Sequence, residues 1–521
     1  MEAPMFARSI LKSVVTCIAA VGTAFGVTMT IDAATEYQTI EGFGGFGGKQ
    51  VWWSSGPFHD ATYLRQTLDD LGITILRDRV PATFELSNDN GDPRSLDLRG
   101  FNFTNRAGHH AAMGERLPLW RAMKQNGLDK FILSYWSPPA WMKTNNDIEN
   151  GGELKRQAYD EFAEYCVASV KVLKDSCGID VYALSVQNEP AFEEPYVSCV
   201  YTAEQYRDLV KVVGARLHEE YPNVKLFGAE DMLKNWTRQD AFPGPLMADP
   251  VSREHLDILA VHGYSDGVHP TPSSQAASMW SRASQNCRSV GKPLWMTETS
   301  GFGSTWSGAM ELAEAIYAAL KFGKVSAWVF WTISAGGDGG YSLISNGTPN
   351  KLFYASKHYY RYIRPGAVMI DIDDSGDEHV FAVAFNHKQD RQLTVVLLNA
   401  GGSAASVSLA AQGLPGQLRK YVSTSTKQCT DEGTVTSGAA ISLDANSVTT
   451  LVGTGYAPPS LRVTRTPSQP YGAGAAPVQG FSYALDGRRV HGPVRAGGVY
   501  YVRSRDRTGD GGRGALRVRL R

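Results

Sequence analysis

The chain has few cysteines, no nucleotide-binding glycine motif and almost no net charge. It holds 6 cysteines in 521 residues and no Cys-x-x-Cys pair, which argues against a zinc site or a thiol redox site. No Gly-x-Gly-x-x-Gly opens a helix after a strand, as a nucleotide site would require. The net charge is −1 and the basic residues of the main body are scattered, so nothing indicates a nucleic-acid-binding surface. What remains is the composition of an ordinary globular protein of two or three domains, 43% hydrophobic and 20% charged.

Residues 1–26 have the pattern of a signal peptide. Arg8 and Lys12 precede the apolar stretch Val14–Val21, and small residues follow at Ala24-Phe-Gly, where a signal peptidase would cut. The stretch is too short to span a bilayer, so we expect a secreted protein without an integral membrane span; a buried helix is the alternative. Export permits disulfides, but the five remaining cysteines specify no pairing, and we expect buried thiols with at most one bridge.

Residues 41–357 alternate short β-branched or aromatic runs with helical patterns. Apolar residues recur at helical spacing over Tyr159–Leu173, a second such pattern ends at Gly72, and Thr202 with Gln205 forms a capping box. Eight βα units predict an α/β fold, a (β/α)8 TIM barrel; a doubly wound sheet is the alternative. The expected strands are Glu41–Gly48 with its loop, Ile73–Val80, Lys130–Trp136, Val181–Val186, Val224–Gly228, Leu256–His262, Pro293–Thr297 and Ala327–Thr332.

After Tyr362 apolar and polar residues alternate without helical spacing. This pattern predicts an associated all-β sandwich domain over 358–455, which residues 27–40 join as an N-terminal strand. Pro, Gly, Ala and Ser are frequent in 456–480, which indicates a linker. Ten arginines and three aspartates give 481–521 a charge of +7, against −8 for the rest of the chain. We expect a small basic C-terminal β-module there.

Two glutamates follow short apolar runs, Glu189 in Val186-Gln-Asn-Glu-Pro and Glu298 in Trp295-Met-Thr-Glu-Thr-Ser. In a parallel barrel the C-terminal ends of the strands share one face, so these glutamates, 109 positions apart, are expected to meet there. A carboxylate pair is the usual means of cleaving a glycosidic bond. A separation of about 5–5.5 Å goes with retention of configuration, and about 6.5–9.5 Å with inversion. A lone glutamate, by contrast, is most often a surface or ion-paired residue.

The immediate neighbours of the two glutamates differ. Asn188 and Pro190 surround Glu189 with an amide and a fixed backbone, which suits a general acid and base. Glu298 stands among the hydroxyl groups of Thr297, Thr299 and Ser300, and we expect hydrogen bonds from them to favour its charged form. A charged carboxylate suits a nucleophile.

Tryptophans accompany the same predicted strand ends. Trp136-Ser-Pro-Pro-Ala-Trp-Met-Lys follows one strand and Trp331 ends the last. Aromatic faces pack on the C–H faces of sugars, although each tryptophan singly is equally expected in a core. Together the motifs resemble glycoside hydrolase family 30, in the large retaining clan of (β/α)8 barrels. The resemblance covers roughly Val27 to Gly453 and rests on Glu41-Gly-Phe-Gly-Gly, Trp136-Ser-Pro-Pro-Ala-Trp-Met-Lys, Val186-Gln-Asn-Glu-Pro, Trp295-Met-Thr-Glu-Thr-Ser and Tyr359-Tyr-Arg-Tyr-Ile-Arg-Pro-Gly.

The resemblance implies roles for individual residues. Glu189 matches the acid/base of the family and Glu298 its nucleophile. Six further residues match supporting and substrate-binding positions: Asn188 for the sugar 2-hydroxyl, Arg77 and Tyr264 beside the nucleophile, and His262, Trp136 and Trp331 as subsite walls. No metal and no cofactor is implied.

The family acts on several β-linked substrates, and its catalytic motifs do not separate them. Thr299–Gly308 contains no arginine to match the usual uronate clamp, which argues against a strict glucuronoxylanase. We expect a monomeric, secreted retaining β-glycoside hydrolase of cell-wall polysaccharide. Xylan (endo-β-1,4-xylanase type) is preferred, and endo-β-1,6-glucanase or glucosylceramidase-like β-glucosidase activity is the alternative. A noncatalytic carbohydrate-binding protein on the same barrel is the alternative of another class.

The end of the chain carries a second, shorter resemblance. Tyr483-Ala-Leu-Asp-Gly-Arg-Arg-Val and Gly498-Val-Tyr-Tyr-Val-Arg are similar to the sorting domain of the type IX secretion route. The alternative is a basic module that adheres to acidic polysaccharide or to the cell surface.

Overall fold

The computed structural model describes residues 27–47, 60–104, 106, 112–237, 241–264, 275–337, 340–373 and 376–458, and the backbone of 481–483, 489–490 and 501–503. The expected signal peptide and nearly all of the expected linker lie outside these residues. The chain divides into two compact units that meet in sequence between Ala457 and Pro458.

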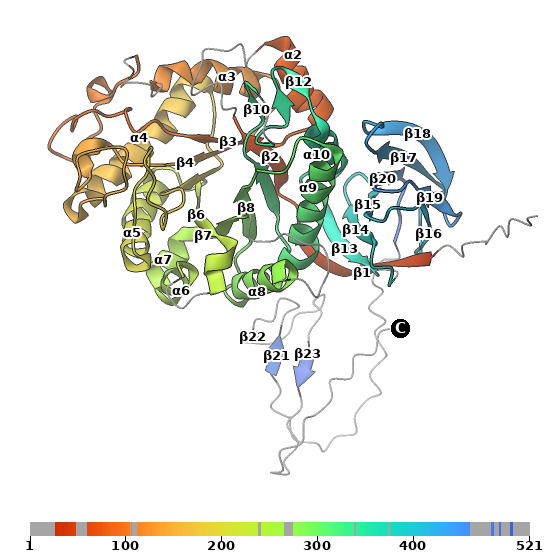
Figure 1. The fold of residues 1–521 in the computed structure, drawn as a ribbon. Coiled ribbons are helices and arrows are strands. Elements are labelled where there is room, and N and C mark those ends of the chain that lie inside the picture. The colour runs from red at the N-terminus through yellow and green to blue at the C-terminus, as the bar shows by residue number, and fades with distance from the viewer. Residues whose placement is uncertain are drawn as a thin grey trace, which may run out of the picture. The chain divides into compact units, whose positions relative to one another are not determined.

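Eight parallel strands close into a barrel, as the alternating pattern predicts (Figure 1). In chain order they are β2 (Gly42–Phe46), β3 (Ile75–Arg79), β4 (Lys130–Ser134), β5 (Ala183–Ser185), β6 (Lys225–Met232), β7 (Leu256–His262), β8 (Leu294–Glu298) and β9 (Ala327–Phe330). Strand β2 pairs with both β3 and β9, which closes the ring. The interior is packed rather than open, because one cluster of buried side chains fills it: Ile75, Ile132, Ala183, Phe227, Ile258, Ala260, Trp295, Ala327 and Val329.

Helices surround the barrel (Figure 1). They are α2 (Ala61–Leu64), α3 (Leu117–Gln125), α4 (Tyr159–Cys177), α5 (Ala203–Glu220), α6 (Pro243–Ala248), α7 (Pro250–His255), α8 (Gln275–Ser289), α9 (Trp306–Ala318) and α10 (Lys351–Tyr360). The expected helix signals are confirmed. Thr202 and Gln205 form the capping box of α5, and Gly72, at φ +81°, ends the helical segment that begins with α2. Three short strands, β10 (Ser334–Ala335), β11 (Ile344–Ser345) and β12 (Thr348–Pro349), form a small sheet in the segment between β9 and α10.

The all-β part is one continuous nine-stranded sheet that encloses its own core. Its order is β18-β17-β20-β15-β14-β13-β1-β16-β19. The strands are β1 (Val27–Thr39), β13 (Val368–Ile372), β14 (Val380–His387), β15 (Gln392–Asn399), β16 (Ala405–Ala410), β17 (Gln417–Ser423), β18 (Thr430–Thr436), β19 (Ile441–Leu443) and β20 (Ser447–Thr454). Strand β1 joins the two layers of the expected sandwich, because its first residues pair with β16 and its later ones with β13.

Polar contacts tie the barrel to this sheet. From α10, the buried ring of His358 lies 2.8 Å from Thr450 Oγ1 on β20 and 2.8 Å from Ser423 Oγ on β17. From α9, Trp306 donates its indole N–H to the carbonyl oxygen of Asn446 at 2.8 Å. These contacts explain why barrel and sheet form one compact unit.

The five cysteines in the described residues are all buried and free, so the bridge that the sequence left open does not form among them. None of the helices in the described part of the chain has the length and apolar character needed to cross a bilayer. In the second unit, β21 (Phe481–Tyr483), β22 (Arg489–Val490) and β23 (Tyr501–Arg503) form an antiparallel sheet in the order β22-β21-β23.

Candidate active site

Arg77 on β3 connects most of the polar residues at the C-terminal end of the barrel. Its side chain is fully buried and donates from Nη1 to Glu298 and from Nη2 to Asn188 Oδ1 at 2.7 Å and to Glu230 Oε1 at 2.9 Å. Burial alone would lower the pKa of Arg77, but the negative charges of Glu230 and Glu298 raise it, so the guanidinium stays charged. The expected neighbourhood of Arg77, Asn188 and Glu298 is therefore present.

Glu298, the last residue of β8, is held by Arg77 on one carboxylate oxygen and by the hydroxyl of Tyr264 on the other. Burial raises the pKa of Glu298, and the positive charges of His262 and Arg77 act in the opposite direction. Burial and the negative charge of Glu298 raise the pKa of Tyr264 well above its usual value, so this hydroxyl remains a donor. Both oxygens of Glu298 thus accept a hydrogen bond, which orients the carboxylate.

The hydroxyl groups beside Glu298 do not serve the expected purpose. Thr297 and Thr299 donate to the backbone oxygens of Val261 and Gly263 on the neighbouring chain segment. The expectation that the three hydroxyls hold the charge on Glu298 is wrong. The two threonines flank Glu298 in the sequence and so point to the opposite face, and Ser300 Oγ is buried without a hydrogen-bond partner. The stabilising donors come from β3 and from the segment after β7.

Glu189 lies in the loop after β5, four residues beyond the strand end at Ser185, whereas Glu298 is itself the last residue of its strand. Its backbone is left-handed, with φ +46°, a conformation uncommon outside glycine. Its Oε1 lies 2.7 Å from Nδ1 of His262, the last residue of β7. Burial alone would lower the pKa of His262, but the charge of Glu298 and hydrogen bonds with Glu189 and Glu230 raise it to about 9. The imidazolium therefore links the two glutamates electrostatically.

Glu230 is a site residue that sequence reasoning missed. The expected strand stopped at Gly228, whereas β6 continues to Met232 and carries Glu230, fully buried and left-handed at φ +58°. Burial alone would raise its pKa, but the charges of Arg77 and His262 and hydrogen bonds from His262 and Ser185 together lower it to about 2; His262 Nε2 lies 3.5 Å from its Oε1. The consecutive acids Glu230 and Asp231 after an apolar run were the signal in the sequence.

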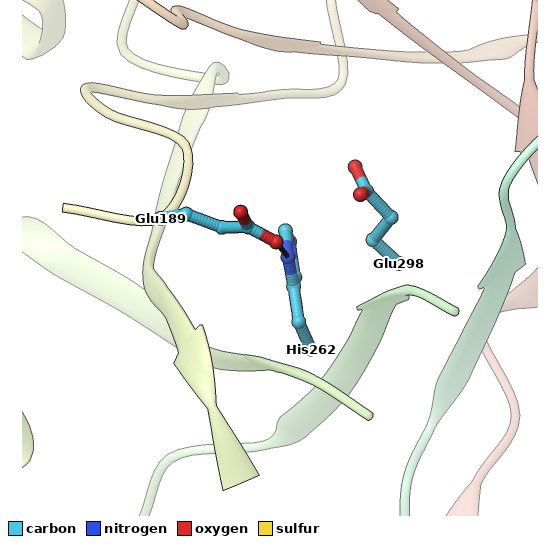
Figure 2. Close-up of side chains that lie close together, drawn as sticks. All are labelled: Glu189, His262 and Glu298. Carbon is cyan, nitrogen blue, oxygen red and sulfur yellow. Dashed lines mark hydrogen bonds and ion pairs between the residues drawn. The ribbon is translucent and has the colours of Figure 1, made fainter. Parts of the chain in front are cut away.

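The two carboxyl groups meet as the sequence predicts. Figure 2 shows Glu189 and Glu298 on either side of His262, with the bond between Glu189 and His262 dashed. One carboxylate oxygen of each glutamate and one ring nitrogen of His262 lie within 4.8 Å of one another. This approach of one oxygen from each carboxyl group is closer than the about 6.5–9.5 Å between the carboxyl groups of inverting enzymes and agrees with the about 5–5.5 Å of retaining ones.

The same three atoms have the spacing of metal ligands, but their partners do not suit a cation. Arg77 and Tyr264 already donate to both oxygens of Glu298. His262, whose pKa is about 9, is charged at neutral pH. A metal ion would meet two adjacent positive charges, so this donor set fits a sugar hydroxyl better than a metal ion.

The two expected aromatic walls differ in exposure. Trp136 is only 5% exposed, and the guanidinium of Arg77 lies 4.8 Å from its ring centre. Trp331, just after β9, is partly exposed and packs on Phe46 with ring centres 4.3 Å apart. Trp331 therefore has the larger exposed ring surface, whereas the ring of Trp136 mainly packs on the guanidinium of Arg77.

A closed (β/α)8 barrel with two carboxylates this close at the C-terminal strand ends is the arrangement of a glycoside hydrolase. Comparison with known proteins places the chain within that class. A family model, the glycosyl hydrolase family 30 TIM-barrel domain, matches residues 54–365, and the chain belongs to this family. It is therefore a glycoside hydrolase of a family for which a retaining mechanism is typical.

The relatives differ in the activities for which they are named. Glucuronoxylanase XynC of Bacillus subtilis (strain 168) is 24% identical over 81% of this chain and 91% of its own length. Putative glucosylceramidase 1 of Caenorhabditis elegans is 26% identical over 72% of this chain and 76% of its own. The crystal structure of the family 30 subfamily 8 xylanase Xyn30A from Clostridium acetobutylicum is 26% identical, with a TM-score of 0.65 over 82% of this chain and 99% of that one.

Proposed function

We propose that the protein hydrolyses β-linked cell-wall polysaccharide by double displacement, with Glu298 as nucleophile and Glu189 as general acid and base. The observation that carries this proposal is the approach of their carboxylate oxygens to within 4.8 Å at one end of the barrel. Glu298 attacks the anomeric carbon while Glu189 protonates the departing oxygen, so one C–O bond forms as the other breaks. Glu189 then removes a proton from the water that displaces Glu298.

Neighbouring residues support these two steps. Arg77 and Tyr264 aim the Glu298 carboxylate, and His262 holds Glu189. Because Arg77 donates to Asn188 Oδ1, the amide nitrogen of Asn188 is the group left to donate to a sugar 2-hydroxyl. Trp331 offers a partly exposed ring for stacking on a sugar face.

Within the polysaccharides, xylan is the leading substrate in this proposal. The 24% identical glucuronoxylanase, aligned over most of both chains, supports xylan. Thr299–Gly308 contains no arginine that could bind a glucuronate carboxylate, which argues against a requirement for glucuronate. The relative named as a glucosylceramidase supports the second candidate, a β-glucosidase activity. β-1,6-Glucan is a further β-linked substrate to be tested.

The test combines two active-site variants with a substrate panel. We expect Glu298→Ala and Glu189→Ala to lower turnover of aryl β-glycosides by at least about 1,000-fold without unfolding the protein. Azide should partly restore the Glu189→Ala variant, because azide displaces Glu298 from the intermediate without needing a general base, as water does. Near-normal turnover in either variant would refute the assignment of that residue.

The panel separates the substrates. Wild-type protein is incubated with xylan, glucuronoxylan, β-1,6-glucan and glucosylceramide, and the products are sized. Short xylo-oligomers support the leading proposal, and glucose from glucosylceramide supports the second. Binding of polysaccharide without hydrolysis of any substrate would indicate a noncatalytic carbohydrate-binding protein.

We also propose that the protein is exported and that residues 481–521 take part in sorting. The proposal rests on the basic and apolar pattern of residues 8–26, and on Tyr483-Ala-Leu-Asp-Gly-Arg-Arg-Val near the other end. A polymeric cell-wall substrate lies outside the cytoplasm, so export agrees with the proposed reaction.

A further inference from the structure

Glu194 is a buried carboxyl group in an exposed segment beside the site. Its neighbours from Ala191 to Tyr196 are exposed, and the rings of Phe192 and Tyr196 are 53% and 50% exposed. The side chain of Glu194 alone turns inward and is 3% exposed. Burying a carboxyl group costs free energy unless hydrogen bonds or counter-charges offset the loss of water, so its position calls for a physical reason.

The backbone at Glu194 is fixed by buried contacts. Ser198 Oγ accepts a hydrogen bond from Glu194 N at 3.2 Å and donates to Glu194 O at 2.9 Å. Gly151 N donates to the same Ser198 oxygen at 3.0 Å, and the buried amine of Lys143 donates to Ser198 O at 2.6 Å. The inward position of Glu194 is therefore built into the fold.

The groups that face Glu194 are mostly acidic. Its carboxyl group makes a side-chain hydrogen bond with Glu189 on the same loop, and Glu298 from β8 and His262 from β7 also act on its charge. Burial, and to a smaller extent the negative charge of Glu189, raises the pKa of Asp231 of β6, so Asp231 is a further acid near this group. Among the residues that the structure describes, no lysine or arginine forms an ion pair with Glu194, and its Oε2 is buried without a hydrogen-bond partner.

These surroundings favour a neutral carboxyl group. Burial, followed by the negative charge of Glu189, raises the pKa of Glu194 to about 9. A group with this pKa keeps its proton at neutral pH and serves as a hydrogen-bond donor, whereas an ionised carboxylate only accepts.

We propose that Glu194 is a positioning residue that stays protonated during turnover and donates a hydrogen bond to Glu189 when Glu189 becomes a carboxylate. The inference rests on the proposed role of Glu189 as acid and base. When Glu189 transfers its proton to the departing oxygen, it gains a negative charge, and the Glu194 O–H stabilises that charge without transferring its own proton. Glu189 is therefore a stronger acid toward the departing oxygen, and a strongly basic leaving group departs more readily.

Two variants separate this role from packing. Glu194→Gln keeps the shape and a donor, whereas Glu194→Leu keeps the bulk and removes the donor. Aryl β-glycosides with a poor leaving group need the proton from Glu189, and 2,4-dinitrophenyl glycosides do not. We expect Glu194→Leu to lower kcat/KM about tenfold or more on the first and less than about twofold on the second. Glu194→Gln should stay within about threefold of wild type on both. Equal losses on both leaving groups in Glu194→Leu would indicate a packing role and overturn the proposal.

A second measurement needs no activity. In protein labelled with 13C at the glutamate carboxyl carbon, wild type should show one carboxyl resonance that titrates near pH 9, absent from the spectrum of Glu194→Gln. If every resonance lost in Glu194→Gln titrates below pH 6, the neutral carboxyl is refuted. If wild type hydrolyses no aryl β-glycoside, the proposed function fails instead, and the resonance still decides whether Glu194 is protonated.

Discussion

At the scale of single residues, Arg77 is what lets several acids share a buried site. One planar guanidinium reaches Glu298, Asn188 and Glu230 at the same time, and the ring of Trp136 covers its face. A lysine ammonium could not form this fork of bonds from one position. The guanidinium is in turn fixed by Glu230, which makes no bond to either proposed catalytic glutamate.

The role of Glu230 leads to a prediction. Glu230→Gln keeps the shape but removes the charge opposite Arg77, and breaking a buried ion pair by removing one charge costs roughly 3–5 kcal/mol. We expect the free energy of unfolding in urea to fall by about that amount. We also expect kcat/KM to fall at least about tenfold, because Arg77 then holds Glu298 and Asn188 less firmly.

Asp231→Asn is the matched control on the same strand. The Asp231 carboxylate accepts hydrogen bonds from the Asn235 side chain and from Met232 N, which an amide oxygen can also accept. The change should therefore cost less than about 1.5 kcal/mol. If both variants lose the same free energy of unfolding and the same kcat/KM, the ion pair between Arg77 and Glu230 contributes no more than the hydrogen bonds of Asp231.

How well the site could be predicted varied from residue to residue. Glu189, Glu298 and Asn188 stand in compact motifs, Arg77 lies on a predicted strand, and the structure brings them together. Glu230 was missed although two consecutive acids follow an apolar run there, because the counter-charge that allows its burial comes from Arg77 on another strand. The prediction that the threonines beside Glu298 donate to its carboxylate failed for a related reason, since neighbouring residues of a strand point to opposite faces of the sheet.

At the scale of elements, the loop after β5 carries both the acid group and an exposed aromatic surface. Phe192 N donates to Glu189 O at 2.9 Å, so Phe192 lies within one turn of the proposed acid. Its ring is 53% exposed and Tyr196 is 50% exposed. A general acid stands beside the departing sugar, so, with Glu189 in the proposed role, we expect these exposed rings to stack on the leaving part of a polymer.

Phe192→Ala should therefore discriminate by the length of the substrate. A lost stacking contact is worth roughly 0.5–1.5 kcal/mol, so we expect KM for polysaccharide to rise about two- to tenfold. KM for aryl β-glycosides, whose leaving group is too short to use the platform, should be unchanged.

Val251→Ala is the control, because this residue is 46% exposed but lies on α7, which leads into the opposite end of β7. Its kinetics on both substrates should match wild type. If Phe192→Ala raises KM equally for short and long substrates, the ring shapes the site itself and does not bind polymer.

The sequence located the elements well where one pattern dominates. Seven of the eight barrel strands lie within the predicted ranges or within one residue of them, because apolar runs between turn signals are distinctive. Strand β6 extends four residues beyond its predicted end, since Asp231 and Met232 still pair with β7. In the all-β part the alternation predicted the fold over 358–455 but did not place the short or polar strands β16 to β19, because their alternation is weak and their pairing is set by distant partners.

At the scale of the whole molecule, the joint between barrel and sheet depends on a neutral histidine. His358 on α10 is fully buried, and its two ring nitrogens face hydroxyl groups on β20 and β17. One ring nitrogen donates and the other accepts, which a charged imidazolium cannot do. Burial, with a smaller effect from Lys357, lowers the pKa of His358 to about 3.

This pKa predicts a loss of stability in acid. The unfolded chain binds a proton at His358 below its ordinary pKa of 6.5, whereas the folded protein does not until about pH 3, so protons favour unfolding between these values. The effect amounts to roughly 4–5 kcal/mol when complete. We expect His358→Gln to be less stable than wild type by about 1–2 kcal/mol at pH 7, where one hydrogen bond is lost, and to lose less stability between pH 6.5 and pH 4. Urea unfolding at several pH values measures both.

His379→Gln is the control, because the side chain of His379 is 59% exposed. The dependence of its unfolding free energy on pH should match that of wild type. If all three proteins lose stability at the same rate in acid, the charging of His358 does not govern how barrel and sheet stay joined.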